Sequence, residues 1–307
     1  MRGRVNTESM HTNTLQHQNI GILAAWGRYP IVVAEALRAQ GARVVGLGVK
    51  DHVGPEFIDL CDEYKRIGVA QLGTAIRFFK KHDVTAATMA GKFHKTQIFK
   101  RFLWLKHLPD LQFIRTFYPH FITATRDRKD DTILGTIVEA FGNFGIHFAP
   151  ATNFVPELLV KEGLIAGRNL TFAQQKDVEF GWQLASEMGR LDVGQSVCVT
   201  GQAVLAVEAV EGTDECIRRA GGLCSSNFTV VKIAKPQQDM RFDVPTIGVG
   251  TLETMREAGA KTLAVQADKT IFLDREEIVR LANKWGIQIV ALKSESVTSS
   301  EHSRRAA

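Results

Sequence analysis

The chain has 307 residues, an apolar fraction of 45% and a formal net charge of +5. This length accommodates two ordinary domains, and the composition is that of a globular protein, which excludes a largely disordered or fibrous chain. No apolar run reaches the ~18 residues of a membrane-spanning helix, so helical membrane spans are excluded as well.

The two ends of the chain are predicted to be disordered. Residues 1–18 are polar and lack the apolar core of a signal peptide, and residues 294–307 are similarly polar. The cysteines are scattered without a CxxC pair, which is typical of reduced thiols; they are Cys61, Cys198, Cys216 and Cys224. These features predict a cytoplasmic protein.

Residues 19–150 are predicted to form a first α/β domain. An apolar strand over 20–24 leads through a turn of small residues into a helix and then a strand over 43–49. Strand, turn, helix and strand within about 30 residues are typical of a βαβ unit with parallel strands. Residues 69–92 and 130–151 repeat the order of helix followed by strand. The pattern predicts a Rossmann-like, open parallel sheet.

The segment 92–108 inside this domain combines positive charge with large apolar side chains. A helix of this kind can pack on its own domain, lie on an anionic membrane surface or bind nucleic acid, and the residues alone leave all three open. Its basic residues are Lys92, Lys95, Lys100, Arg101 and Lys106, and its aromatic residues include Phe93, Phe99, Phe102 and Trp104.

Residues 151–293 are predicted to form a second domain, a mixed α/β fold. A helix with apolar residues at helical spacing covers 173–191. A hairpin then turns around Gly201 and precedes a helix that opens near Thr213. Further strands are expected over 228–235, 262–267, 270–274 and 287–292, with helices over 251–260 and 275–286.

The first turn, "AAWGRYP", is a candidate for phosphate binding. Dinucleotide-binding domains have G-x-G-x-x-G at this point, and only Gly27 is present here, so a dinucleotide site is weakly supported. Arg28 nevertheless adds positive charge where the N-terminus of the next helix already favours an anion. Contact with a substrate phosphate through Gly27 and Arg28 and a plain structural turn are both open.

Carboxylates gather in the segment "EAVEGTDE", which runs from the end of a strand into a helix. Carboxylates at a helix N-terminus are common as caps, and Thr213 or Asp214 fits that role. Glu211 and Asp214 also suit Mg²⁺, which binds one or two carboxylates together with phosphate oxygens of a substrate. The spacing leaves both interpretations open.

The stretch "KIAKPQQDMRFDVPTIG" concentrates charge in a short segment that two prolines prevent from forming one helix. It is predicted to be a strand that runs into a rigid loop, with Lys235 and Arg241 available for phosphate oxygens and Asp239 for a metal or a water. Strand-like alternation would separate Gln238 from Asp239, Arg241 and Asp243. An internal ladder of ion pairs is the alternative.

Four segments together resemble the UDP-2,3-diacylglucosamine pyrophosphatases of the LpxI type. They are "GILAAWGRYP", "LDVGQSVCV", "AVEAVEGTDECIRRAG" and "KIAKPQQDMRFDVPTIG", and the resemblance extends in order over residues 19–292. The first turn departs from the family pattern because Ala25 and Trp26 stand where glycines are usual.

The resemblance implies a Mg²⁺-dependent enzyme of lipid A biosynthesis, with its ligand cleft between the two domains. It would hydrolyse UDP-2,3-diacylglucosamine to UMP and 2,3-diacylglucosamine 1-phosphate by attack of water on the α-phosphorus. The essential aspartate of the family aligns with Asp239. The expected roles are catalysis by Asp239, Lys235 and Arg241, substrate binding by Gly27, Arg28, Gln195, Thr213 and Gln238, and metal binding by Asp239, Glu211 and Asp214.

Two alternatives of other classes stay open at this point. A carrier or sensor would bind an acylated nucleotide-sugar without turnover, and an oxidoreductase would need the glycines that the first turn lacks. The expected partners are the lipid substrate and the cytoplasmic face of an anionic membrane, where segment 92–108 would dock peripherally. A second copy of the chain is a further candidate partner, and nucleic acid is not expected.

Overall fold

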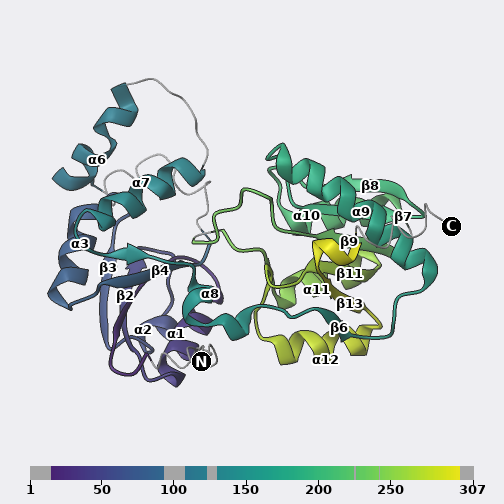
Figure 1. Ribbon diagram of the computed structural model, residues 1–307, viewed down its shortest axis with the longest axis horizontal. Helices are drawn as coiled ribbons and strands as arrows, with labels where there is room; N and C mark the ends of the chain where they lie inside the picture. Colours follow the sequence, from purple (N-terminus) through teal and green to yellow (C-terminus); the bar gives the residue numbers. More distant parts are fainter. Residues whose placement is uncertain (1–14, 93–107, 123–129, 225, 242, 298–307) are drawn as a thin grey trace, which may run out of the picture. The chain divides into compact units, whose positions relative to one another are not determined.

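The computed structural model describes residues 15–92, 108–122, 130–224, 226–241 and 243–297 (Figure 1). The chain divides into two compact units, Met1–Val155 and Pro156–Ala307, each with its own sheet. The short helix α8 (Ala151–Phe154) ends the first unit, so the division falls just past residue 150. The ligand cleft expected between the two domains stays a prediction.

The first unit contains a sheet whose strand pairs are all parallel, in the order β3-β2-β1-β4-β5. The order reverses between β1 and β4, as it does in the doubly wound sheets that bind nucleotides. This arrangement confirms the predicted Rossmann-like fold. Its strands are β1 (Asn19–Ala24), β2 (Arg43–Val49), β3 (Glu63–Ile67), β4 (Ala86–Ala90) and β5 (His147–Phe148).

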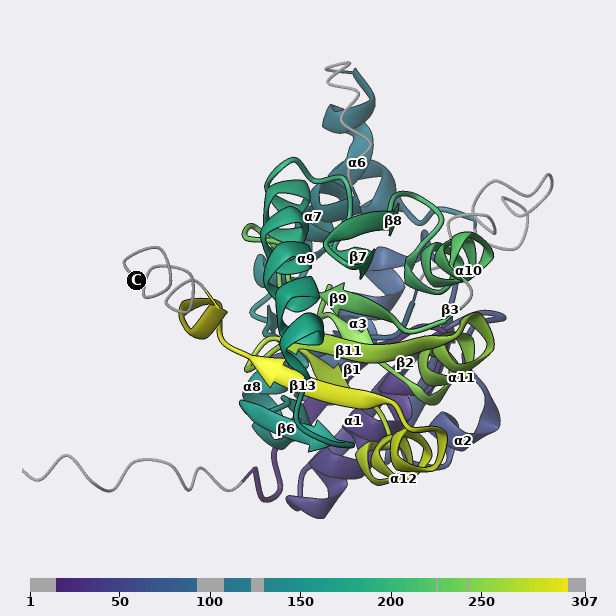
Figure 2. The same cartoon turned by 90° about the vertical axis from the view of Figure 1, so that its right-hand side faces the viewer.

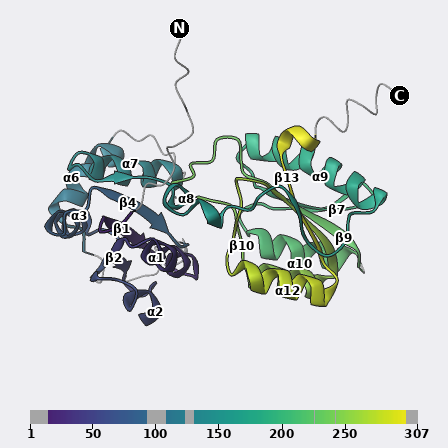
Figure 3. The ribbon, with the colours of Figure 1, turned by 60° about the horizontal axis from the view of Figure 1, so that its bottom comes forward.

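Helices cover both faces of this sheet, with α1 below and α7 above in Figure 3. Helix α1 buries Val33 and Leu37, whereas Phe79 of α3 packs against Phe141 of α7 with ring centroids 5.9 Å apart. Burial on both faces explains why β1 and β2 are almost continuously apolar. The helices are α1 (Tyr29–Ala39), α2 (Pro55–Ile58), α3 (Leu72–Lys81), α6 (Leu111–Ile122) and α7 (Asp130–Gly142).

The loops that follow β1 and β4 are joined by backbone hydrogen bonds. Ala25 N donates to Ala90 O at 2.8 Å, and Trp26 and Lys92 exchange two bonds of 3.2 and 2.8 Å. The close approach depends on Gly91, which has φ +107° and whose added Cβ would lie 2.7 Å from the Ala25 carbonyl carbon. The ends of β1 and β4 are thereby fixed at the switch point of the sheet.

The second unit contains a mixed sheet in the order β6-β13-β11-β9-β7-β8 (Figure 2). It also contains a separate parallel pair, β10-β12. Strands β13, β11 and β9 are parallel, and β6, β7 and β8 pair antiparallel to their neighbours. The strands are β6 (Gly163–Ala166), β7 (Ser196–Thr200), β8 (Ala203–Val207), β9 (Phe228–Lys232), β10 (Thr246–Ile247), β11 (Ala260–Gln266), β12 (Ile271–Phe272) and β13 (Gln288–Leu292).

Helices cover both faces of this mixed sheet, with α9 on one side and α10 and α12 on the other (Figure 3), and an apolar cluster lies beneath the helices of each side. One side packs α9, with Trp182 and Ala185 against Val197 and Val231. The other side packs α10, α11 and α12. A capping box between Thr171 and Gln174 begins α9. The helices are α9 (Phe172–Arg190), α10 (Thr213–Leu223), α11 (Val249–Ala258) and α12 (Arg275–Trp285), after a 3₁₀ turn at Pro156–Leu158.

Residues 294–297 differ from the sequence prediction, which placed them in a disordered tail. They form a helical turn, and Val297 is only 5% exposed because it packs into the cluster beneath α9. One apolar residue in a polar stretch carries too weak a pattern to reveal this packing from sequence. These four positions belong to the folded second unit.

The backbone geometry at Gly91 predicts how a substitution there changes the stability of the protein. Gly91→Ala forces a Cβ onto the Ala25 backbone at a φ that side chains rarely adopt, so the free energy of unfolding should fall by about 1–3 kcal/mol. Gly135→Ala in α7 meets no atom within 4 Å and should raise it by about 0.5–1 kcal/mol. Urea unfolding of both variants checks this, and equal stabilities would contradict it.

Candidate functional site

The register of the second sheet brings distant motifs to one edge. Lys232 at the end of β9 pairs with Val265 near the end of β11, and Gln266 pairs with Leu292 at the end of β13. The antiparallel pair β7-β9 places Ser196, the first residue of β7, opposite Lys232. Ligands of open α/β sheets bind outside the carboxyl ends of the parallel strands, and this is the edge assembled here.

The glycine of "DVGQ" allows two segments to meet at this edge. Glu208 N donates to Ser196 O at 2.9 Å, which draws the end of β8 against the start of β7. A Cβ on Gly194 would overlap the Glu208 carbonyl oxygen. The motif therefore has a packing reason that is independent of any contact with substrate.

A buried polar network occupies the same edge. The Lys232 ammonium donates to Thr213 Oγ1 at 3.0 Å and to Thr246 O at 3.2 Å, and Thr213 donates to Glu208 Oε1 at 3.1 Å. Because the Thr213 proton points to Glu208, the Ser196 hydroxyl 3.3 Å away is the donor to Thr213. Lys232 and Glu208 are 6% and 7% exposed. Glu208 Oε2 is buried and has no hydrogen-bond partner among the described residues.

Thr213, the first residue of α10, is therefore held by hydrogen bonds to other residues of the protein. The N-cap is Gly212, with φ 86° and no side-chain cap, rather than Thr213 or Asp214. Thr213 remains only partly buried, so a contact with substrate stays a prediction. The sequence did not predict this network, and only the position of Lys232 and Glu208 at strand ends, beside the charged motifs, signalled them.

The loop after β9 is closed by hydrogen bonds between Lys235 and Gln238. Lys235 N donates to Gln238 Oε1 at 2.9 Å, and Gln238 N donates to Lys235 O at 3.0 Å. The Lys235 ammonium reaches Asp192, in the segment before β7, at 2.8 Å. Asp192 was not predicted as a site residue. The predicted cation thus lies at the carboxyl edge and already has a carboxylate beside it.

Asp239 and Arg241 form a pair within this loop. The Arg241 Nε lies 2.9 Å from Asp239 Oδ1, its Nη2 bonds Oδ2, and the Arg241 backbone N–H donates to Oδ1 at 3.0 Å. The Arg241 guanidinium holds the pKa of Asp239 below its ordinary value, and the backbone bond lowers it further against the opposing effect of burial. Asp239 is consequently an ionised, partly exposed carboxylate.

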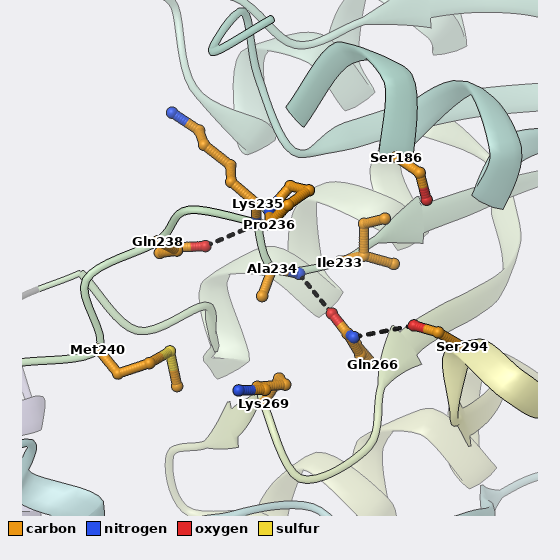
Figure 4. A pocket seen from close by; sticks show the side chains of 10 residues that line it. All are labelled: Ser186, Ile233, Ala234, Lys235, Pro236, Gln238, Met240, Gln266, Lys269 and Ser294. Atoms are coloured by element: carbon orange, nitrogen blue, oxygen red, sulfur yellow. Dashed lines mark hydrogen bonds between the residues drawn. The ribbon is translucent and has the colours of Figure 1, made fainter. Parts of the chain in front are cut away.

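Of the ladder of ion pairs that was the alternative for this segment, the structure contains one pair. Asp239 and Arg241 are paired, whereas Asp243 is exposed and makes no ion pair among the described residues. Residues 233–241 and 243–245 are a loop and not a continued strand. The alternation expected from sequence nevertheless persists locally, because Gln238 and Met240 line a pocket that Asp239 and Arg241 do not line (Figure 4).

The three predicted metal ligands do not converge. Glu211 pairs with Arg219 and accepts from Ala209 N, Asp214 accepts from Thr251 Oγ1 at 3.0 Å, and Asp239 is held by Arg241. Throughout the described part of the chain, no three His, Cys, Asp or Glu residues are grouped to hold a metal ion. The donors present suit Mg²⁺ at a single ionised carboxylate, Asp239, with phosphate oxygens of a substrate as the further ligands.

Two predicted substrate-binding glutamines have buried amide atoms without partners in the described structure. They are Gln195 Oε1 and Gln238 Nε2. Buried polar atoms are nearly always hydrogen-bonded, so these two amides are exceptions at this edge. Contact of either amide with substrate stays a prediction.

In the first unit, Gly27 and Arg28 line a pocket of about 280 Å³ with Trp26, His52 and Phe57. Gly27 has φ +110°, and Arg28 lies immediately before α1 with its guanidinium 3.6 Å from Glu35 Oε2. Both partners of this pair are more than 40% exposed, so the pair contributes little to stability, and contact of Gly27 or Arg28 with a substrate phosphate stays a prediction.

The basic segment 93–107 lies outside the described residues, and only its flanks, Lys92 and Leu108, are described. Among the helices that the structure describes, none combines the length and the apolar character needed to cross a membrane. Leu108 is 55% exposed, and the helix that follows exposes Leu111 at 81%.

The fold and the site define a two-domain α/β protein with a charged site at the carboxyl edge of its second sheet. Residues 19–158 match the model of the LpxI N-terminal domain, and residues 161–290 match that of the LpxI C-terminal domain. The chain therefore belongs to the LpxI family, which confirms the resemblance drawn from the motifs.

A relative from Caulobacter vibrioides has the name UDP-2,3-diacylglucosamine pyrophosphatase LpxI. It is 25% identical over 285 residues, which cover 90% of this chain and 98% of that protein. Among solved structures, a biotin carboxylase domain of a single-chain bacterial carboxylase matches with a TM-score of 0.22 and 14% identity, over 57% of this chain and 35% of that one. A similarity this low supports no argument about the fold.

The Asp239–Arg241 pair predicts a measurable titration. Because the pKa of Asp239 is lowered in the folded protein, its ionised form stabilises the fold at pH values above the ordinary carboxyl pKa. This stabilisation is lost as the pH falls through the lowered pKa. Arg241→Met should return the pKa of Asp239 toward its ordinary range, as followed by NMR of the labelled carboxyl carbon. Arg280→Met removes the comparable exposed pair with Glu277 and should leave Asp239 unchanged. An unshifted pKa in Arg241→Met would overturn this account.

Proposed function

We propose that the protein hydrolyses the pyrophosphate bond of UDP-2,3-diacylglucosamine in lipid A biosynthesis. The products are UMP and 2,3-diacylglucosamine 1-phosphate, and water attacks the α-phosphorus. The observation that carries the proposal is the ionised Asp239, paired with Arg241, in the same loop as Lys235 at the carboxyl edge of the second sheet. Family membership and the name of the Caulobacter relative support the same substrate and the assignment as a hydrolase.

Cations and a carboxylate suit this reaction. A pyrophosphate carries negative charge that repels a nucleophile, so positive groups must neutralise its oxygens as the bond breaks. Lys235 and Arg241 supply such charge, and each is now paired with a carboxylate that substrate phosphate would replace. Asp239, once released from Arg241, orients the attacking water or accepts its proton.

Mg²⁺ is the proposed cofactor. Asp239 would hold the ion with phosphate oxygens of the substrate, and Glu211 or Asp214 would contribute only after leaving Arg219 or Thr251. When bound, the ion supplies Lewis-acid polarisation of the phosphoryl oxygens. Gln195, Gln238 and Thr213 would hydrogen-bond phosphate or sugar from the same edge, and Gly27 with Arg28 would bind a further substrate phosphate in the first unit.

Isotope labelling tests the reaction. In ¹⁸O-labelled water, the wild-type protein with Mg²⁺ should release UMP that carries the label, and EDTA should abolish release until Mg²⁺ is restored. Asp239→Asn should lower the rate by about 10²–10⁴-fold, the range lost with a positioned acid–base group. Glu277→Gln, which removes an exposed carboxylate paired with Arg280 on α12, should retain the wild-type rate. Label found only in the sugar phosphate would overturn the direction of attack.

A carrier or sensor of an acylated nucleotide-sugar is the second candidate. The exchangeable ion pairs at Lys235 and Arg241 suit anion binding without chemistry equally well. The two candidates separate on turnover, because a carrier binds the lipid and releases no UMP. An ionised carboxylate beside the phosphate-binding cations favours the enzyme, since a carboxylate only weakens the binding of an anion.

We propose further that the protein acts in the cytoplasm and associates peripherally with an anionic membrane surface. Helix α6 supports this from the described residues, because Leu111, Ile114 and Tyr118 are 81%, 47% and 60% exposed and share one helical face. An exposed apolar face next to a basic segment is typical of interfacial binding. A second copy of the chain is a further candidate partner.

Vesicle binding tests the membrane proposal. Changing Lys100, Arg101 and Lys106 to Ala should weaken binding to vesicles with an anionic lipid by on the order of hundredfold, since each basic residue near the surface adds about 1 kcal/mol. A variant with Arg275, Arg280 and Lys284 of α12 changed to Ala loses the same formal charge and should bind as the wild type does. Equal binding by all three proteins would remove the basic segment from the proposal.

A further inference from the structure

A pocket of about 260 Å³ lies at the carboxyl ends of all three parallel strands of the second sheet (Figure 4). Ile233 and Lys235 follow β9, Gln266 ends β11, and Ser294 follows β13. The Gln266 amide links the segments that follow β9 and β13. Its oxygen accepts a hydrogen bond from Ala234 N at 3.0 Å, and its nitrogen donates to Ser294 Oγ at 3.1 Å. The pocket is therefore built from ordered parts of the sheet.

The charges around the pocket are of one sign. Lys235 and Lys269 are among the lining residues, and no Asp or Glu is. Asp268, the carboxylate next to Lys269 in the chain, faces Lys161 at 2.8 Å. Lys269 itself is exposed and makes no ion pair among the described residues. A cation without a carboxylate beside it is available to a ligand, in contrast with Lys235, which holds Asp192.

The backbone that carries Lys269 is fixed on both sides. Asp268 N donates to Val160 O at 2.8 Å, and Val160 N donates to Thr270 O at 2.9 Å. Asp268 adopts φ 57°, which places Lys269 at the tip of a tight turn between β11 and β12. Figure 4 shows the Lys269 ammonium directed toward the side of the pocket where Met240 lies. A fixed backbone lowers the entropy lost when the side chain binds a ligand.

The other lining groups match a phosphorylated sugar. The Gln238 amide nitrogen is a buried donor without an acceptor in the described structure. Ile233, Pro236 and Met240 supply apolar surface for the face of a ring. The volume lies just below the ~300–1,000 Å³ of pockets for whole drug-sized ligands, so it suits a sugar phosphate head and excludes long acyl chains.

We propose that this pocket binds the phosphate monoester of the sugar half of the substrate, with Lys269 as a further phosphate-binding residue. The inference rests on the proposed function and specifies it. The loop 238–241 then separates two tasks, because Gln238 and Met240 line the sugar phosphate pocket while Asp239 and Arg241 do not. After the bond to UMP has broken, the positive charge of Lys269 neutralises part of the negative charge of the sugar phosphate.

Binding of small phosphates to the full chain tests the assignment. Titrations followed by ³¹P NMR would use glucosamine 1-phosphate, inorganic phosphate and UMP as separate probes. Lys269→Met keeps the length of the side chain and removes its charge, and should weaken glucosamine 1-phosphate about tenfold to hundredfold while leaving UMP unchanged. Lys269→Arg should recover most of the affinity. Lys284→Met, on the exposed surface of α12, is the matched control.

The outcomes also separate this inference from the proposed function. Hydrolysis by the wild type together with unchanged glucosamine 1-phosphate affinity in Lys269→Met would overturn the pocket and leave the hydrolase in place. Absence of hydrolysis with Lys269-dependent sugar phosphate binding would overturn the hydrolase and support the pocket. Equal weakening of UMP and glucosamine 1-phosphate would overturn the assignment to the sugar half, and inorganic phosphate binding as tightly as glucosamine 1-phosphate would overturn the role of the sugar ring.

Discussion

A buried lysine fixes the edge of the second sheet on which the charged groups depend. Lys232 ends β9, and its ammonium bonds the carbonyl of Thr246 in β10, so one side chain closes the loop 233–245 at its base. The same ammonium bonds Thr213 at the start of α10. A cation removed from water is tolerated only when such partners surround it, so alternative arrangements of these segments are disfavoured.

The two predicted phosphate-binding cations of the loop after β9 are each paired with a carboxylate in the absence of a ligand. Lys235 bonds Asp192, and Arg241 bonds Asp239. Pairs that remain in contact with water contribute little to stability, so a phosphate can replace either carboxylate without a large loss. In the proposed reaction this exchange has a second effect at Asp239, because a carboxylate released from arginine would become available to a metal ion or a water. Binding of the anion and exposure of the carboxylate would then be one event.

Periodicity sufficed to predict the fold, whereas the site depends on contacts that periodicity does not contain. The alternation of apolar strands and helices predicted both α/β domains, and the charged loop was located because Pro236 and Pro245 exclude a helix there. The carboxylates near residue 211 were neighbours in sequence, yet Glu211 turns to Arg219 and Asp214 to Thr251. Such directions follow from the packing of α10 and α11.

Residues outside motifs were harder still to find. Lys269 lies in a turn whose placement depends on Val160, more than a hundred positions away in the chain, and a single lysine in a turn gives no pattern. Val297 packs beneath α9 from a stretch that is otherwise polar. In both cases the position of the residue depends on a contact with residues distant in the chain, which cannot be predicted from a single sequence.

The closeness of Asp239 and Arg241 in the chain also bears on the speed of the site. Partners two residues apart can separate by rotation about side-chain bonds, without movement of the backbone, and such rotations take picoseconds to nanoseconds in exposed side chains. Turnover in enzymes is commonly about 1–10³ per second, many orders of magnitude slower. In the proposed reaction, freeing the carboxylate would therefore add no delay to the catalytic cycle, whereas a rearrangement of the backbone segments that Lys232 bonds would be slower.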